Sequence, residues 1–140
     1  MPTDPAVFVS SVICESVLRE TTGVSSAVRI MSAIKLNPIQ THVHFFVLTS
    51  FHQPNYGVPD LHFHEAVIQM VGNRAGGWEI VASAKPYSFV YTRKDEAIGG
   101  MELATEFTVD LSKLPDLGTY FMQVLLDGQL VAQAPLSLLR

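Results

Sequence analysis

Histidine is the residue type whose placement in this sequence most directly suggests chemistry. All five histidines lie between residues 42 and 64, and four of them form two His-x-His pairs, His42 with His44 and His62 with His64. In an extended strand, residues two apart project to the same face, so each pair presents two imidazoles side by side. Imidazole nitrogens are common ligands of zinc and nickel. The spacing suggests a metal site, or a group of side chains that gain charge together as the pH falls below neutral.

The metal hypothesis depends on how two predicted strands pair. If residues 41–51 and 61–71 form a hairpin, His44, His62 and His64 lie near one another, although a register shift of one residue moves His44 to the opposite face. Glu65 or Asp60 could add an oxygen ligand. Ordinary strand histidines, half-buried or exposed and hydrogen-bonded, explain the same pattern, and we prefer this interpretation because the third and fourth ligands that usually confirm a metal site cannot be placed. We therefore expect no cofactor, with zinc as the alternative.

The sequence contains no motif typical of a catalytic centre. It has no Gly-x-Ser-x-Gly elbow and no His-Glu-x-x-His pair. Cys14 lies in an apolar run, where a buried and unreactive thiol is the usual case. Glu102, Glu106 and Asp110 share one strand parity, as acids on the solvated side of a sheet do. We predict that the protein is not an enzyme.

Aromatic side chains in predicted loops and at strand ends are the other candidates for recognition. Tyr56, Trp78, Tyr87 and Tyr91 could form a binding patch, because amphipathic rings tolerate both water and a partner. Packing of the rings across a strand pair explains Trp78 and Tyr87 equally well. Such a patch would bind another protein or a small ligand, for example a carbohydrate.

Strand patterns must position all of these residues, since no sustained helical period is present. Nine apolar or alternating segments are separated by Gly, Pro, Asn and Asp: residues 7–17, 27–34, 41–51, 61–71, 78–83, 87–91, 101–111, 120–126 and 130–139. The pair Asp127-Gly128 joins the last two and predicts a tight hairpin. The series predicts an all-β protein: a single antiparallel two-sheet sandwich of about seven to nine strands, in one domain spanning residues 1–140.

The residues that precede the last hairpin resemble the tyrosine corner of immunoglobulin-like domains. Asp116, Gly118 and Tyr120 have its Asp-x-Gly-x-Tyr spacing, and in that family the tyrosine hydroxyl pins the connection before the strand. Met122 stands where antibody domains have a cysteine, so the inter-sheet disulfide is absent. The end of the chain is also similar to that of small uncharacterised bacterial β-sandwich proteins, in Tyr120, Val124, Asp127, Gly128, Pro135 and Leu136. The resemblance implies an immunoglobulin-like fold and transfers no functional site.

The charge balance narrows the choice of partner. The chain of 140 residues has a formal net charge of −4, and only 16% of its residues are charged, against about 25% in typical proteins. This composition argues against nucleic acid and against an anionic membrane. The start of the chain is acidic and broken by proline, unlike a secretory signal, and one cysteine cannot form an internal disulfide, so we expect a cytoplasmic protein.

The shortage of charge also leaves apolar surface that another subunit can cover. We therefore expect a non-enzymatic protein-binding or assembly module, a homo-oligomer or a partner of another protein, which acts through exposed sheet edges or end loops. Two alternatives stay open. One is a metal-binding or pH-sensing protein that uses the histidine cluster, and the other is a small-ligand binder.

Overall fold

The computed structural model describes residues 8–19, 25–53, 63–74, 77–89, 99–114 and 117–140. Within these ranges the chain forms ten strands and one short 3₁₀ helix. In chain order they are β1 (Phe8–Arg19), β2 (Ser25–Ile30), β3 (Ala33–Lys35), β4 (His42–Gln53), β5 (His64–Arg74), β6 (Gly77–Ser83), β7 (Tyr87–Phe89), β8 (Gly99–Asp110), η1 (Leu111–Lys113), β9 (Gly118–Leu126) and β10 (Gln129–Leu139). No helix in the described ranges is long and apolar enough to cross a membrane.

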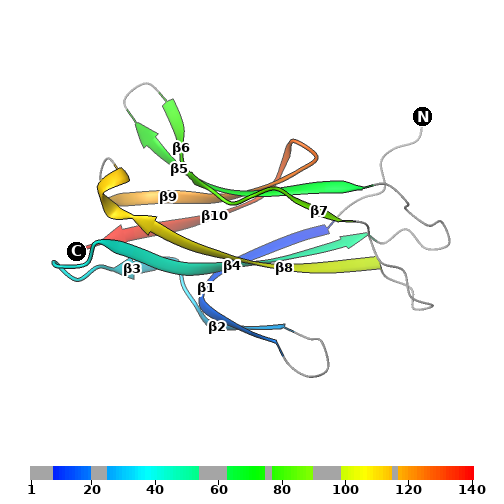
Figure 1. Ribbon diagram of the computed structural model, residues 1–140, viewed down its shortest axis with the longest axis horizontal. Helices are drawn as coiled ribbons and strands as arrows, with labels where there is room; N and C mark the ends of the chain where they lie inside the picture. Colours follow the sequence, from blue (N-terminus) through cyan, green and yellow to red (C-terminus); the bar gives the residue numbers. More distant parts are fainter. Residues whose placement is uncertain (1–7, 20–24, 54–62, 75–76, 90–98, 115–116) are drawn as a thin grey trace.

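The strands form two sheets that face each other across one core (Figure 1). The four-stranded sheet has the order β2-β1-β4-β8, and the six-stranded sheet has the order β3-β10-β9-β5-β6, with β7 also pairing with β5. All pairings are antiparallel except that of β3 with β10, which is parallel. The all-β, two-sheet sandwich predicted from the sequence is confirmed.

The count of ten strands exceeds the predicted seven to nine because one predicted strand divides in two. Residues 27–34 begin in β2, beside β1 of the four-stranded sheet, and continue in β3, beside β10 of the six-stranded sheet. Arg29 has a φ of 57°, a conformation that bends the chain out of a regular strand. The segment therefore crosses from one sheet to the other.

The core lies between the inward rows of both sheets, as strand alternation requires. On β4 every second side chain from Val43 to Phe51 is buried, and the same holds on β5 from Ala66 to Met70. Phe45 stacks on Phe107 of β8, with ring centroids 5.4 Å apart. The principal buried residues of the core are Ile13, Val43, Phe45, Val47, Phe51, Ile68, Met70, Phe107, Met122, Val124, Leu136 and Leu138.

The hairpin assumed for residues 41–51 and 61–71 does not form. β4 lies between β1 and β8 in one sheet, whereas β5 pairs with β9, β6 and β7 in the other. The two strands are joined by residues 54–63, a connection too long to force neighbouring strands into one hairpin. Both strands bury one full row of side chains, and opposing sheets bury these rows as well as a hairpin would.

Two other local predictions can be compared with the structure. Asp127 and Gly128 have φ values of 52° and 81°, so the tight hairpin predicted between the last two strands forms with the two positive φ angles that such a turn requires. The strands predicted at residues 61–71 and 78–83 are longer toward each other than expected, because β5 continues to Arg74 and β6 begins at Gly77.

Tyr120, the residue that carries the immunoglobulin resemblance, is buried in the core with 3% of its surface exposed. It lies opposite Gly72 on the neighbouring strand β5. A Cβ atom on Gly72 would lie only 2.6 Å from Cε1 of the tyrosine ring. The absence of a side chain at Gly72 therefore makes room for the ring, as glycine does where an aromatic packs across a strand pair.

Candidate functional site

The histidines of β4 lie on the outer face of the four-stranded sheet. His42 and His44 alternate with the buried residues Val43 and Phe45, and β8 runs alongside with its acids on the same face. His44 Nε2 lies 2.7 Å from Glu106 Oε1. Both side chains of this pair are about half exposed, so the pair contributes little to stability.

His64 occupies a different place, at the start of β5 in the six-stranded sheet. Its Nδ1 lies 2.7 Å from Oδ2 of Asp127, the turn residue between β9 and β10. The other carboxylate oxygen of Asp127 accepts a hydrogen bond from the backbone N–H of Glu65, and the backbone N–H of Asp127 donates to the carbonyl of Glu65. Asp127 thus ties the hairpin turn to β5, and His64 takes part in that structural contact.

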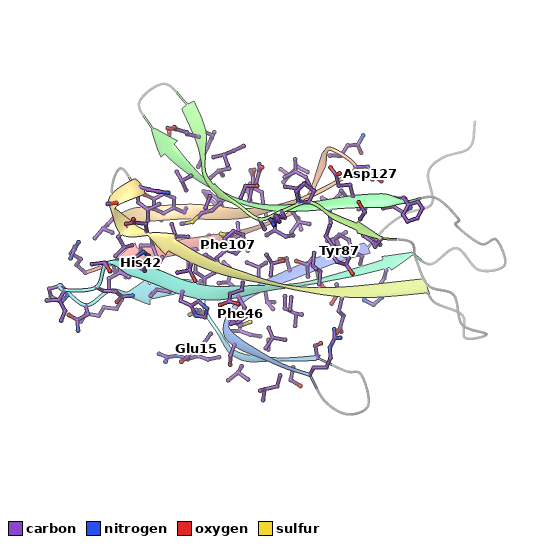
Figure 2. All side chains as sticks on the ribbon, in the orientation of Figure 1. Glu15, His42, Phe46, Tyr87, Phe107 and Asp127 are labelled. Carbon is purple, nitrogen blue, oxygen red and sulfur yellow. The ribbon has the colours of Figure 1, made fainter. Side chains whose placement is uncertain are left out.

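The structure does not bring His44 and His64 together. They lie in opposite sheets, and Figure 2 shows His42, the neighbour of His44, and Asp127, the partner of His64, toward opposite ends of the sandwich. His62 lies outside the described residues. In the part of the chain that the structure describes, no three His, Cys, Asp or Glu side chains form a group that could hold a metal ion.

Asp110, at the end of β8, caps the helix η1. Its carboxylate accepts a hydrogen bond of 2.9 Å from the backbone N–H of Ser112. Hydrogen bonds from Ser112 lower the pKa of Asp110 below its usual value, and the charges of His42 and Lys113 lower it slightly further. The cap fixes the C-terminal end of β8.

Cys14 is buried, as the sequence predicts, but it does not belong to the core between the sheets. It lies on β1, opposite Phe46 of β4 and Ile30 of β2. Burial raises the pKa of its thiol, against a smaller lowering by a hydrogen bond from the backbone of Val28. These surroundings favour the neutral, unreactive thiol.

Of the four aromatic residues suggested as one patch, the structure describes two, Trp78 and Tyr87, and these two lie apart. Trp78 lies on the outer face of β6, opposite Asn73, whereas Tyr87 lies opposite Ala66 near the other end of β5. Seven residues of strand separate these two positions, roughly 23 Å. Tyr87 stacks on Phe89, and Tyr56 and Tyr91 lie outside the described residues.

Trp78 instead belongs to a surface that we call the glutamine face, the outer face of β6, β5, β9 and β10 in the six-stranded sheet. Three glutamines cross it: Gln69 Nε2 donates to Gln123 Oε1 at 3.0 Å, and Gln123 Nε2 donates to Gln133 Oε1 at 2.9 Å. Trp78 packs edge-on against Phe121, with ring centroids 5.3 Å apart. The apolar residues of the face are Val67, Val71, Trp78, Ile80, Phe121 and Leu125.

The glutamine face is nearly free of charge, although Lys35 of β3, beyond β10 on the same side of the sheet, is exposed. By strand alternation, Glu65 is the single ionisable side chain described on β5, β6, β9 and β10 that points outward. Trp78 and Ile80 are nevertheless 60% and 56% exposed. The outer face of the other sheet is different, because it carries the histidines of β4 and the acids of β8.

The glutamine face was missed in the sequence because it depends on strand register. Gln69, Gln123 and Gln133 lie far apart in the chain and are aligned only by the pairings of β5 with β9 and of β9 with β10. The sequence does contain one signal of the glutamine face. Each glutamine sits at an outward position between two apolar neighbours of its strand, a position where charged residues are the usual choice.

The described sheets and their core define an immunoglobulin-like β-sandwich. The alkylpurine DNA glycosylase AlkC of Pseudomonas fluorescens, solved bound to DNA containing an abasic site analog, is similar to this chain, with a TM-score of 0.53 at 10% sequence identity. The match covers 93% of this chain and 30% of the glycosylase chain, so this chain spans less than a third of that protein's length. At this identity the likeness shows the fold alone.

An immunoglobulin-like protein from Pseudomonas aeruginosa also matches, with a TM-score of 0.38 at 10% identity, over 95% of this chain and 96% of that one. No family model and no curated protein matches the sequence.

Proposed function

We propose that this chain is a non-enzymatic assembly module in which a second copy docks on the glutamine face. The observation that carries the proposal is the combination of exposed apolar side chains with a lack of charge on that face. Exposed apolar patches on proteins mark interaction sites, and interface centres are poor in charge and rich in aromatic residues. Trp78 is the residue type most often found at the energetic centre of an interface.

Charge favours a second copy as the occupant. Each chain has a net charge of −4, so two copies repel each other wherever their acidic surfaces meet. On the glutamine face this repulsion is smallest, because Glu65 at its margin is the single outward charge among the described side chains of its four strands. An isologous contact between two such faces brings apolar rows and amides together without opposing like charges.

The area of the glutamine face sets the expected affinity between two copies. Four strands about 4.8 Å apart, each contributing about seven residues, give a flat footprint of about 450 Å² per copy. Specific interfaces bury about 800 Å² per partner, and smaller ones belong to weak or transient complexes. We therefore expect a micromolar dimer.

Two other classes of ligand are less well supported. Small-molecule sites are concave and enclose most of their ligand, whereas the glutamine face is built from side chains that stand side by side on a sheet. The glycosylase with a similar fold was solved bound to DNA. The negative net charge of this chain and the acids on β8 oppose phosphate contacts, so we do not propose DNA binding for it.

Sedimentation velocity over a range of concentrations tests the proposal with two matched variants. Ile80→Lys places a charge on the glutamine face, and Ile30→Lys makes the same change on β2 of the other sheet, where Ile30 is 66% exposed. The wild-type protein and Ile30→Lys should shift together from monomer to dimer, and Ile80→Lys should stay monomeric. A wild-type protein that is monomeric throughout, or two variants that dissociate equally, would contradict the proposal.

A further inference from the structure

Among the described strands, β8 forms a long edge of the four-stranded sheet. Its twelve residues pair with β4 on one side, in a continuous register from His42 with Asp110 to Gln53 with Gly99. On its other side no described strand pairs with it. The outer described strands β2, β3, β6 and β7 are shorter, at six, three, seven and three residues.

The backbone groups that β8 presents at its free edge can be assigned. The N–H of Leu111 donates to the carbonyl of Thr41 at 2.9 Å, one step beyond the pairing of His42 with Asp110. Hydrogen-bonded pairs alternate along an antiparallel ladder, so odd-numbered residues of β8 direct their N–H and C=O groups toward β4. The even-numbered residues from 102 to 110 therefore direct theirs to the open side.

The same even-numbered residues carry the charge of the strand. Glu102, Glu106 and Asp110 point to the outer face at intervals of four, with Ala104 and Thr108 between them. The strand has no Lys, Arg or Pro, residues with which proteins commonly block an exposed edge. The edge thus combines three regularly spaced carboxylates with backbone groups that no described strand pairs.

We infer that the β8 edge binds an extended segment of another protein that carries a basic residue at every fourth position. Such a segment would add a fifth strand to the sheet, with main-chain hydrogen bonds for affinity and alternate side chains for selectivity. Its basic residues would lie opposite Glu102, Glu106 and Asp110, where opposite charges on neighbouring strands attract. Its other face would lie beside the inward row of β8, which includes Phe107 and Val109.

A second copy of this chain fits the edge poorly. If two β8 strands paired with Glu106 opposite its own equivalent, Glu102 would lie opposite Asp110, so every acid would face an acid. Like charges directly opposite each other destabilise a strand pair. The edge site therefore needs a basic partner, and it does not depend on self-association through the glutamine face.

A nine-residue peptide tests the inference directly. The sequence Lys-Val-Thr-Val-Lys-Val-Thr-Val-Lys, with blocked ends, reads the same in both directions and matches the spacing of the three acids in either orientation. Titration by NMR in the Ile80→Lys background excludes effects of the glutamine face. We expect saturable binding that weakens with salt, and binding at least about tenfold weaker for the same peptide with glutamate in place of lysine.

Hydrogen exchange of β8 amides distinguishes edge pairing from simple charge attraction. The N–H groups of Ala104, Glu106 and Thr108 should exchange quickly in the free protein and become protected by the peptide. Those of Leu103 and Thr105 should be protected in both states, because they bond to β4. If the peptide protects even-numbered and odd-numbered amides of β8 alike, the edge site is refuted.

A pair of substitutions at one position completes the test. Ala104→Pro removes an N–H that faces the open edge and leaves the β4 ladder intact, a change that edge strands tolerate. Ala104→Val keeps the N–H. We expect Ala104→Pro to bind the lysine peptide at least about tenfold more weakly than the unsubstituted protein, and Ala104→Val to bind it with the same affinity. Equal affinity of the two variants, once both are shown to be folded by circular dichroism, or equal affinity for the lysine and glutamate peptides, would refute the inference.

Discussion

Gly72 and Tyr120 are opposed on the neighbouring strands β5 and β9, and we predict that Gly72→Ala destabilises the protein through this contact. The new Cβ would lie 2.6 Å from Cε1 and 2.9 Å from Cδ1 of the tyrosine ring, whereas carbon atoms prefer about 3.5–4.0 Å. The ring must therefore move by about 1 Å in a close-packed core, which typically costs 1–3 kcal/mol. We expect a loss of about 2 kcal/mol and a fall in Tm of about 6 °C.

The direction of the stability change shows whether the contact with Tyr120 decides the effect of Gly72→Ala. Gly72 is not among the described glycines with positive φ, so its backbone suits alanine. At such positions alanine normally stabilises a protein by about 0.4–1 kcal/mol, because it restricts the unfolded chain. A loss of stability must therefore come from the contact with the ring.

Urea unfolding of a double-mutant cycle measures that contact. In a Tyr120→Leu background, Gly72→Ala should be neutral or stabilising, which gives a coupling energy of about 2 kcal/mol between the two positions. The reasoning is refuted if Gly72→Ala stabilises the protein with Tyr120 present. It is also refuted if the substitution costs the same in both backgrounds.

Three further predictions concern single side chains. Cys14 should react with a thiol reagent only after unfolding, and rapid labelling of the native protein would contradict this. Because burial raises the pKa of the Cys14 thiol above 9.0, the buried thiol stabilises the fold fully below pH 9, and this stabilisation falls as the pH rises further. Asp110→Ala should lower Tm at pH 7 but have less effect in acid, because the lowered pKa of Asp110 stabilises the fold above about pH 3.8 and this contribution is lost as the pH falls through the folded-state pKa. Asp110→Asn keeps an acceptor for the N–H of Ser112, so its Tm at pH 7 should lie between those of the wild-type protein and Asp110→Ala. Three equal Tm values at pH 7 would argue against the cap. Glu106→Gln should change the unfolding free energy by less than about 1 kcal/mol, because its pair with His44 is exposed, and a loss above about 2 kcal/mol would show that the pair matters more than its exposure suggests.

The strands could be predicted from the sequence because their signals are local. Alternation along β4, with Val43, Phe45 and Val47 inward, is visible without knowledge of any partner strand. The same holds for Asp127 and Gly128, whose turn requires positive φ at two successive residues. For these elements the structure differs from the prediction mainly at the strand ends.

Strand pairing could not be predicted, because it depends on contacts between distant parts of the chain. The expected neighbourhood of His44 and His64 relied on pairing β4 with β5, and these strands lie in opposite sheets. The alignment of Gln69 with Gln123 likewise follows from the register of β5 against β9. A period of two places a side chain on a face of its strand, but it does not say which strand lies beside it.

The most direct test of the proposed assembly is the fluorescence of Trp78, the only tryptophan in the chain, as a function of protein concentration. Trp78 is 60% exposed on the glutamine face, so docking of a second copy there should move its ring out of water. We predict that its emission maximum shifts to shorter wavelength over the concentration range in which sedimentation shows dimer, and that Ile80→Lys abolishes the shift while Ile30→Lys keeps it. A dimer that forms with unchanged tryptophan emission would place the contact elsewhere and contradict the proposal.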